Sequence, residues 1–318
     1  MAHTYFFSNV TAVLADEDRA RLQVIRSTLH YLGFRDVTWG HSLGELRDLA
    51  ESRRPDLIIA SHDLPGGSTA QYLQQIRRGR TATDPFTPII AVLSEASPDA
   101  VRRGIDSGAD DLLIHPWPTG YLDGRLEKLI HGRKSFVVSA DYVGPDRRAK
   151  ARPGPQAAVL TPPNVLEAKA LRRQPDEAVA AELAACRRAL ESHRLQALAT
   201  LCVRLVEDVE AMNARQQLAD PLAATQLRRL RAAAEDAARL AVQTPSAGAA
   251  IAFTFQDMAR HAGLCGDALT CGRIASIGDL GQLRDTVAAA FRIETALLLD
   301  QPTEAAPGPA TATTTVTP

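Results

Sequence analysis

Short apolar runs alternate with amphipathic segments over the first part of the chain, up to about Gly132. Each run is long enough for a buried strand, and the intervals between runs are long enough for a helix. Strands that alternate with helices are typical of a parallel sheet covered on both faces. The pattern therefore predicts an α/β fold with a doubly wound sheet of five parallel strands. The predicted strands are Thr11–Ala15, Asp36–Trp39, Leu57–Ala60, Ile89–Leu93 and Asp111–Ile114.

Helix start and stop signals agree with this alternation. The apolar stripe of residues 19–32 ends at Gly33, a residue that commonly terminates helices. Ser42 is placed to cap a second helix at Leu43–Ser52. Ser97-Pro98 opens a later helix that we expect to stop at Gly108, and a fifth should follow Pro118.

The rest of the chain divides by composition. Residues 134–175 are basic and interrupted by prolines, which predicts a semi-rigid, extended linker instead of a compact element. Residues 176–300 are rich in Ala, Leu, Arg and Glu, as an antiparallel helical bundle requires. Residues 301–318 form a Pro/Ala/Thr tail with too little apolar surface to fold. The first domain is therefore expected at residues 9–133.

Charge and cysteine content narrow the class of protein. The formal net charge of the 318 residues is −1, so no global field attracts the chain to nucleic acid or an anionic membrane. No apolar run approaches the length of a bilayer span, and the first residues lack the features of a secretion signal. The four cysteines form no C-x-x-C pair, which argues against a zinc site or a disulfide framework. We expect a cytoplasmic protein that binds neither DNA nor membranes.

Candidate chemistry lies at one edge of the predicted sheet. In a doubly wound sheet the loops that follow the carboxyl ends of the strands converge on one crevice. Asp16 and Glu17 follow the first strand and Ser61 follows the third. Ser94 follows the fourth strand and His115 the fifth. The sequence therefore predicts that these five side chains share a site.

The order of these residues resembles that of response-regulator receiver domains. Pro65-Gly66 after the third strand and the Gly108–Asp111 segment before the fifth carry the same resemblance. In that family an acidic pair, matched here by Asp16 and Glu17, holds Mg²⁺, and an aspartate four residues before the proline accepts a phosphoryl group. Ser61 stands at the position of that aspartate.

The resemblance also assigns roles to three further positions. Ser94 matches the hydroxyl that contacts the arriving phosphoryl group. His115 replaces a lysine, and Leu112 replaces an aromatic residue that acts as a switch. An imidazole is mostly uncharged at neutral pH, in contrast to the amine of lysine. Because a serine hydroxyl cannot form an acyl phosphate, we expect a degenerate phospho-site at Ser61, Ser94 and His115.

The favoured function is a non-enzymatic protein of bacterial two-component signalling that acts through protein–protein interaction, without conventional aspartyl phosphorylation. Its partners would be a histidine kinase or other components of such a pathway, and the helical half could form a homodimer or a docking surface. No cofactor is expected apart from weakly bound Mg²⁺ at Asp16 and Glu17.

Two alternatives remain open at this point. Asp63, two residues beyond Ser61, or a histidine such as His62 or His115 could accept a phosphoryl group. Alternatively, an arginine-rich cluster in the linker could bind an anionic ligand or a nucleotide, since guanidinium groups grip phosphates. The cluster consists of Arg147, Arg148 and Arg152, and its simpler interpretation is a soluble, extended linker.

Overall fold

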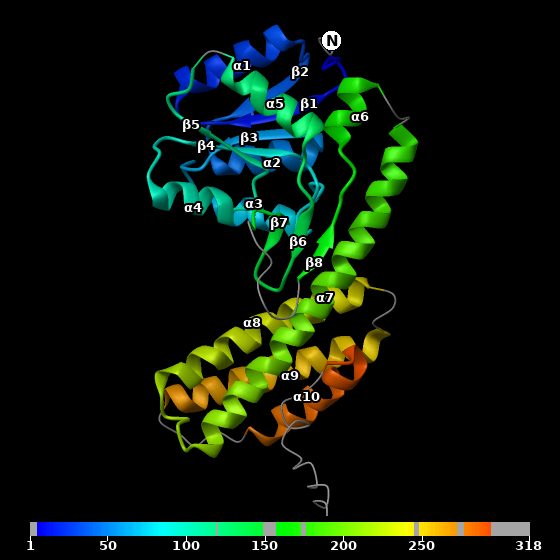
Figure 1. Ribbon diagram of the computed structural model, residues 1–318. Coiled ribbons are helices and arrows are strands. Elements are labelled where there is room, and N and C mark those ends of the chain that lie inside the picture. Colours follow the sequence, from blue (N-terminus) through cyan, green and yellow to red (C-terminus); the bar gives the residue numbers. More distant parts are fainter. Residues whose placement is uncertain are drawn as a thin grey trace, which may run out of the picture. The chain divides into compact units, whose positions relative to one another are not determined.

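The computed structural model describes residues 5–118, 120–148, 157–172, 176–244, 248–271 and 277–293. The chain divides into two compact units, Met1–Leu198 and Ala199–Pro318. The division falls inside helix α7 (Asp176–Ala214), whose residues therefore belong to both units (Figure 1). The sequence-based boundary at residue 176 differs, because the first half of α7 packs with the first unit.

The first unit is built on a parallel sheet with strand order β2-β1-β3-β4-β5, which confirms the predicted fold class. Three strands match their predicted bounds, and β2 and β3 are each one residue longer. The strands are β1 (Thr11–Ala15), β2 (Asp36–Gly40), β3 (Leu57–Ser61), β4 (Ile89–Leu93) and β5 (Asp111–Ile114).

Five helices cover the two faces of this sheet. Helices α1 (Arg19–Leu32) and α5 (Tyr121–His131) lie on one face. Helices α2 (Leu43–Arg53), α3 (Thr69–Arg77) and α4 (Pro98–Asp106) lie on the other. The side chains of successive strand residues alternate between the two faces, so each strand contributes to both cores.

The helix ends follow the sequence signals. The carboxylate of Asp18 accepts hydrogen bonds from the backbone N–H groups of Ala20 and Arg21 at the start of α1. Gly33 ends that helix in the left-handed region, with φ 106°. Ser42 caps α2, as predicted, through a hydrogen bond from the N–H of Glu45. These caps fix where the loops at the carboxyl edge of the sheet begin.

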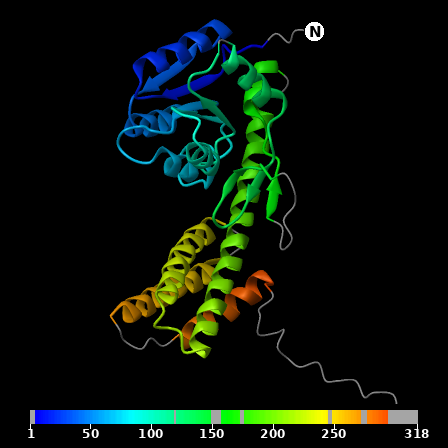
Figure 2. The ribbon, with the colours of Figure 1, turned by 60° about the vertical axis from the view of Figure 1, so that its left-hand side comes forward.

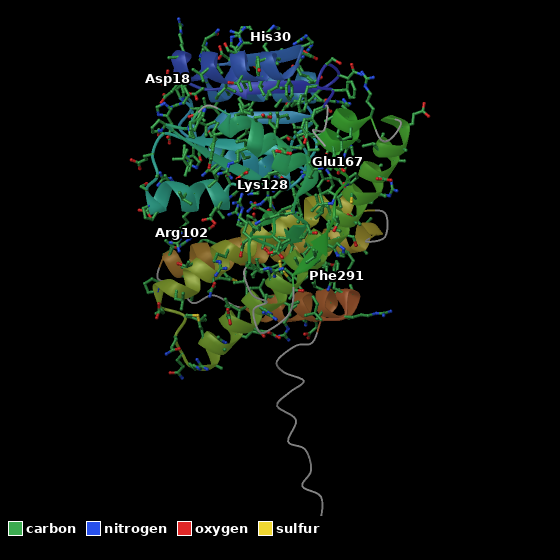
Figure 3. All side chains as sticks on the ribbon, turned by 45° about the horizontal axis from the view of Figure 1, so that its top comes forward. Asp18, His30, Arg102, Lys128, Glu167 and Phe291 are labelled. Atoms are coloured by element: carbon green, nitrogen blue, oxygen red, sulfur yellow. The ribbon has the colours of Figure 1, made fainter. Side chains whose placement is uncertain are left out.

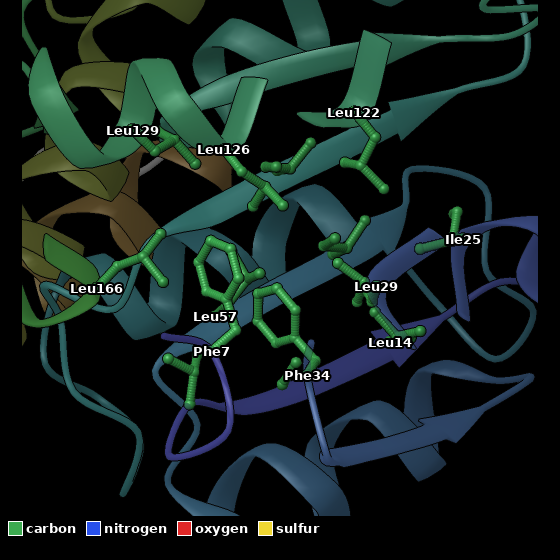
Figure 4. Packing of buried hydrophobic residues seen from close by; sticks show 14 of the residues in the cluster. Phe7, Leu14, Ile25, Leu29, Phe34, Leu57, Leu122, Leu126, Leu129 and Leu166 are labelled. Carbon is green, nitrogen blue, oxygen red and sulfur yellow. The ribbon is translucent and has the colours of Figure 1, made fainter. Parts of the chain in front are cut away.

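The core beneath α1 and α5 is closed by aromatic stacking. The rings of Phe7 and Phe34 are stacked with centroids 4.4 Å apart (Figure 4). Leu166 of helix α6 (Val165–Leu171) packs into the same cluster. A residue from the predicted linker is thus part of the central core.

The prediction of an extended linker is wrong for its described residues. Strands β6 (Phe136–Val138), β7 (Val143–Pro145) and β8 (Ala158–Leu160) form an antiparallel sheet of order β7-β6-β8, the accessory sheet. Pro145 is tolerated because β7 is an edge strand, where a missing N–H donor breaks no inner ladder. Strands of three residues are too short to show periodicity, so the prolines and glycines dominated the prediction.

A buried ionic cluster connects the accessory sheet to the receiver-like part of the first unit. Arg77 of α3 donates to Asp110 Oδ2 at 2.6 Å, and Arg133 Nε lies 3.1 Å from Asp110 Oδ1. Both guanidinium groups lie over the ring of Phe136, at 5.0 and 5.2 Å from its centroid. Phe136 also packs with Leu190 of α7 in a third apolar cluster. Residues 136–138 are therefore held by charge, aromatic contact and apolar packing together.

The second unit consists of α-helices. After α7 come α8 (Pro221–Gln243), α9 (Gly248–Thr270) and α10 (Gly278–Phe291). Helices α8 and α9 run side by side in both views (Figures 1 and 2). The predicted tail at 301–318 lies outside the described residues. Within the described ranges, no helix combines the length and the apolar character needed to span a membrane.

Candidate functional site

The carboxyl edge of the sheet carries an unexpected ion pair at the end of β1. Asp16 has no exposed surface, and its Oδ2 accepts from Arg21 Nε at 2.6 Å. Its Oδ1 accepts from Arg21 Nη2 at 2.7 Å and from the backbone N–H of Asp18 at 2.9 Å. The hydrogen bonds to Asp16 raise the pKa of Arg21 above its ordinary value. Both carboxylate oxygens are therefore engaged by a bidentate, charge-assisted contact.

Ser61 ends the neighbouring strand. The register pairs Ala15 with Ala60, so Asp16 and Ser61 leave the sheet side by side. Ser61 is fully buried, and its hydroxyl oxygen accepts from the N–H of Asp63 at 3.3 Å. The third strand thus brings an uncharged side chain to this edge of the sheet.

Asp63 and Ser94 are brought together by the loops after β3 and β4. The hydroxyl of Ser94 donates to Asp63 Oδ2 at 2.8 Å, and both side chains are exposed. His62 Nδ1 lies 3.6 Å from Asp63 Oδ1, and the His62 side chain is largely buried. Asp63 therefore has a hydroxyl and an imidazole beside it.

The loop after β5 places His115 on the surface. Its ring packs edge-on against Trp117, with centroids 5.5 Å apart. His115 also acts electrostatically on Asp18, which lies at the start of α1 (Figure 3). The N–H of Arg21, with smaller contributions from that of Ala20 and from His115, lowers the pKa of Asp18. Leu112 is buried beneath α4, where Gly104 leaves it room: a Cβ on Gly104 would lie 2.8 Å from Leu112 Cδ2.

The residues at this edge do not fit a Mg²⁺ ion. Mg²⁺ requires free oxygen donors, usually carboxylates, in octahedral geometry. Both oxygens of Asp16 are held by Arg21, and Ser61 offers no charge. Glu17 is exposed, and no group of three acidic, histidine or cysteine side chains suited to a metal ion occurs in the described part of the chain. The guanidinium group supplies the positive charge that a bound cation would bring.

Two arginines of the predicted anion-binding cluster, Arg147 and Arg148, already have hydrogen-bond partners within the protein. Arg147 Nη2 donates to the carbonyl oxygens of Ala109 and Asp110, at 2.8 and 3.0 Å. Arg148 forms a two-point contact with Asp146, which lowers the pKa of that carboxyl group to about 2. Arg152 lies outside the described residues. The contacts of Arg147 and Arg148 support a structural role in holding the segment after β7.

Sequence reasoning missed Arg21. Its signal was present: it follows Asp16 by five residues and belongs to the buried stripe of α1, beside Leu22 and before Ile25. A charged residue in such a stripe needs a buried partner, and two acids already assigned to the site, Asp16 and Glu17, lie within five residues of it.

Comparison with known proteins identifies the family to which the first part of the chain is similar. Residues 12–127 match the family model of the response regulator receiver domain. This part of the chain is a response regulator receiver domain, a module of two-component signalling. The match ends at residue 127, before the accessory sheet and the helical unit.

Relatives match the same region. "Response regulator MprA" of Mycobacterium bovis is 28% identical over 126 residues, covering 40% of this chain and 53% of that protein. "Transcriptional regulatory protein TrcR" of Mycobacterium tuberculosis is 27% identical over 134 residues, covering 42% of this chain and 50% of that protein. The chain spans about half the length of these curated relatives. Among solved structures, chemotaxis response regulator CheY4 of Vibrio cholerae is 26% identical, with a TM-score of 0.34 over 38% of this chain and 98% of that chain.

The second unit offers a groove between α8 and α9. Its volume is about 780 Å³, and its lining includes the exposed apolar side chains of Val242 and Leu264. Arg231 and Glu235, which also line it, form an ion pair within α8. The lining of the groove thus combines apolar and charged side chains.

Proposed function

We propose that this protein is a signalling adaptor whose receiver domain acts through protein–protein interaction, without aspartyl phosphorylation. The observation that carries the proposal is the pair of strand ends at β1 and β3. Ser61 occupies the position from which a receiver presents its acceptor, and the neighbouring Asp16 is neutralised by Arg21. A hydroxyl group without an activating base is a weak nucleophile, and the product of its attack would not be an acyl phosphate.

The groove between α8 and α9 supports an interaction role. Exposed apolar side chains gathered in a concave surface are typical of protein-binding sites. A histidine kinase or another two-component protein is the kind of partner that the receiver domain implies. The chain is proposed to act without enzymatic activity and without binding DNA, although one relative is named as a transcriptional regulator.

The proposal is tested by incubating the full chain with acetyl phosphate and MgCl₂ and measuring its intact mass. We expect no added phosphoryl group. A hydroxylamine-sensitive adduct of one phosphoryl group would refute the proposal. A receiver domain with an intact acceptor, treated in parallel, controls for the activity of the phosphodonor.

Asp63 is the second candidate acceptor because it is exposed and Ser94 donates to it. If an adduct forms, the Asp63→Asn variant decides its site. Loss of the adduct in this variant would assign a phosphoryl-accepting regulator that uses Asp63. An adduct that persists in Asp63→Asn would direct the search to a histidine, through the acid sensitivity of phosphohistidine.

The ligand-sensor alternative predicts that cyclic nucleotides bind near Arg147 and Arg148. Calorimetric titration of the full chain should give no binding heat, because these side chains already contact Ala109, Asp110 and Asp146. Saturable binding that is lost in Arg148→Ala would revive this alternative.

A further inference from the structure

The place where receiver chemistry calls for a divalent cation is next to a buried arginine. Arg21 starts the buried stripe of α1 and has an exposed side-chain fraction of only 7%, while its partner Asp16 has none. A buried charge is tolerated only when it is paired and hydrogen-bonded. Here each needs the other: removing either leaves an uncompensated charge inside the protein.

The contacts of Asp16 disfavour its simultaneous use by a metal ion. The two Arg21 hydrogen bonds, at 2.6 and 2.7 Å, take one lone pair from each oxygen in the plane of the carboxylate. The Asp18 N–H takes a further position on Oδ1. A cation that approached Asp16 would also meet the repulsion of the guanidinium charge in a site of low dielectric constant.

We infer that Arg21 is a built-in counterion that takes the place of a divalent cation at Asp16 and makes the site independent of Mg²⁺. The inference deepens the proposed function, because a receiver that needs no metal ion can keep one arrangement of its carboxyl edge whatever the metal or phosphodonor supply. It also assigns Arg21 a positioning role, since its guanidinium joins the first turn of α1 to the end of β1.

The test uses the full chain and Mn²⁺ and Mg²⁺ alone, without a phosphodonor. For the wild-type protein we expect no saturable enhancement of water proton relaxation on titration with Mn²⁺ beyond that of Asp16→Asn. We also expect the same melting temperature in MgCl₂ as in NaCl of equal ionic strength. Saturable Mn²⁺ binding by the wild type that is abolished in Asp16→Asn would overturn the inference.

Two variants test whether Arg21 prevents a divalent metal ion from binding. Arg21→Met keeps the length of the side chain and removes its charge, leaving Asp16 available. Combined with Ser61→Asp, it should bind Mn²⁺ and gain a melting-temperature increase of about 3 to 6 °C at a Mg²⁺ concentration about ten times its dissociation constant. Ser61→Asp with Arg21 retained should show less than about a tenth of that affinity, because the guanidinium still repels the ion.

Arg19→Met is the matched control. Arg19 is exposed in the same turn of α1, so its loss removes an equal charge without freeing Asp16. Arg19→Met should leave both the Mn²⁺ affinity and the effect of Mg²⁺ on the melting temperature unchanged. Equal Mn²⁺ affinity in Ser61→Asp with and without Arg21→Met would overturn the inference. If Arg21→Met does not fold, the wild-type titration and the Ser61→Asp titration still decide, because tight Mn²⁺ binding in either contradicts a built-in counterion.

The outcomes separate the inference from the proposed function. Metal binding without a phosphoryl adduct would refute the counterion and leave the adaptor function standing. A phosphoryl adduct in a protein that binds no metal ion would refute the proposed adaptor function and leave the counterion inference standing.

Discussion

Arg77 and Asp110 form an ion pair from which solvent is excluded: 2.6 Å separates Nη2 from Oδ2, and Arg77 has no exposed surface. Nε and Nη1 of Arg77 donate to the carbonyl oxygens of Gly108, Pro85 and Thr87 at 2.6 to 2.7 Å. One side chain of α3 thereby joins the loop before β4 to the loop before β5.

Loss of this arginine should destabilise the first unit strongly. Arg77→Met removes the charge and four hydrogen bonds but leaves Asp110 buried, with Arg133 as a charged partner and the N–H of Ile89 as a hydrogen-bond donor. Breaking a buried pair from one side costs about 3 to 5 kcal/mol of unfolding free energy. Urea denaturation measures this loss. Arg102→Met, an exposed change on α4, should alter stability by less than about 0.5 kcal/mol. Equal stabilities of the two variants would contradict a structural role for the cluster.

The same cluster gives a pH dependence. Burial raises the pKa of Asp110, but the charges of Arg133 and Arg77 outweigh it and lower the pKa below its ordinary value. Stability from this carboxylate is therefore complete above its unfolded pKa of about 3.9 and is lost as the pH falls through the lower folded value. The difference in unfolding free energy between wild type and Asp110→Asn should be constant near neutral pH and should shrink only below about pH 4. A difference that already falls between about pH 5 and 7 would contradict this assignment.

Two glycines with the same backbone conformation provide a matched test of close packing. Gly108 and Gly120 both have φ 80°, so alanine at either position carries the strain of the left-handed region, about 1 to 2 kcal/mol. At Gly108 a Cβ would also lie 2.9 Å from Arg77 Cγ and 3.0 Å from the carbonyl oxygen of Val143 in the accessory sheet, whereas Gly120 has open space around it. Gly108→Ala should therefore lose about 1 to 3 kcal/mol more than Gly120→Ala in thermal or urea denaturation. Equal losses would mean that Arg77 and β7 do not pack closely against Gly108.

Cysteine reactivity should report the core of the helical unit. Burial raises the pKa of Cys202 to about 12, whereas Cys271 is exposed. Because the thiolate is the reactive form, Cys202 should stay unmodified by N-ethylmaleimide at neutral pH while Cys271 is labelled. Peptide mass mapping distinguishes the two sites. Labelling of Cys202 at the rate of Cys271 in the native protein would contradict the packing of α7, and labelling of both in urea provides the control.

The sequence correctly predicted the features that hydrophobic periodicity and helix capping determine. Strands β1, β3 and β4 are nearly continuous apolar runs, and α1 lies between Asp18 and Gly33 as its pattern indicated. The structure brings Ser94 close to Asp63, which was foreseen only as an alternative acceptor. These features depend on local signals or on the shared direction of parallel strands.

The features that sequence reasoning missed depend on pairing between distant residues. Arg77, Asp110 and Arg133 each look like solvated charges when taken singly, yet they meet in the interior around Phe136. The accessory sheet has three-residue strands, whose stability comes from the apolar cluster they share with α7. Neither the partner of a buried charge nor the partner of a short strand is encoded locally.

The contact between Asp16 and Arg21 has a consequence for the redesign of this domain. A single Ser61→Asp change would put a second carboxylate beside one whose countercharge is already committed to it. Such a variant would gain an unpaired buried charge before it gained a metal ion. The effects of changes at positions 21 and 61 should therefore be epistatic.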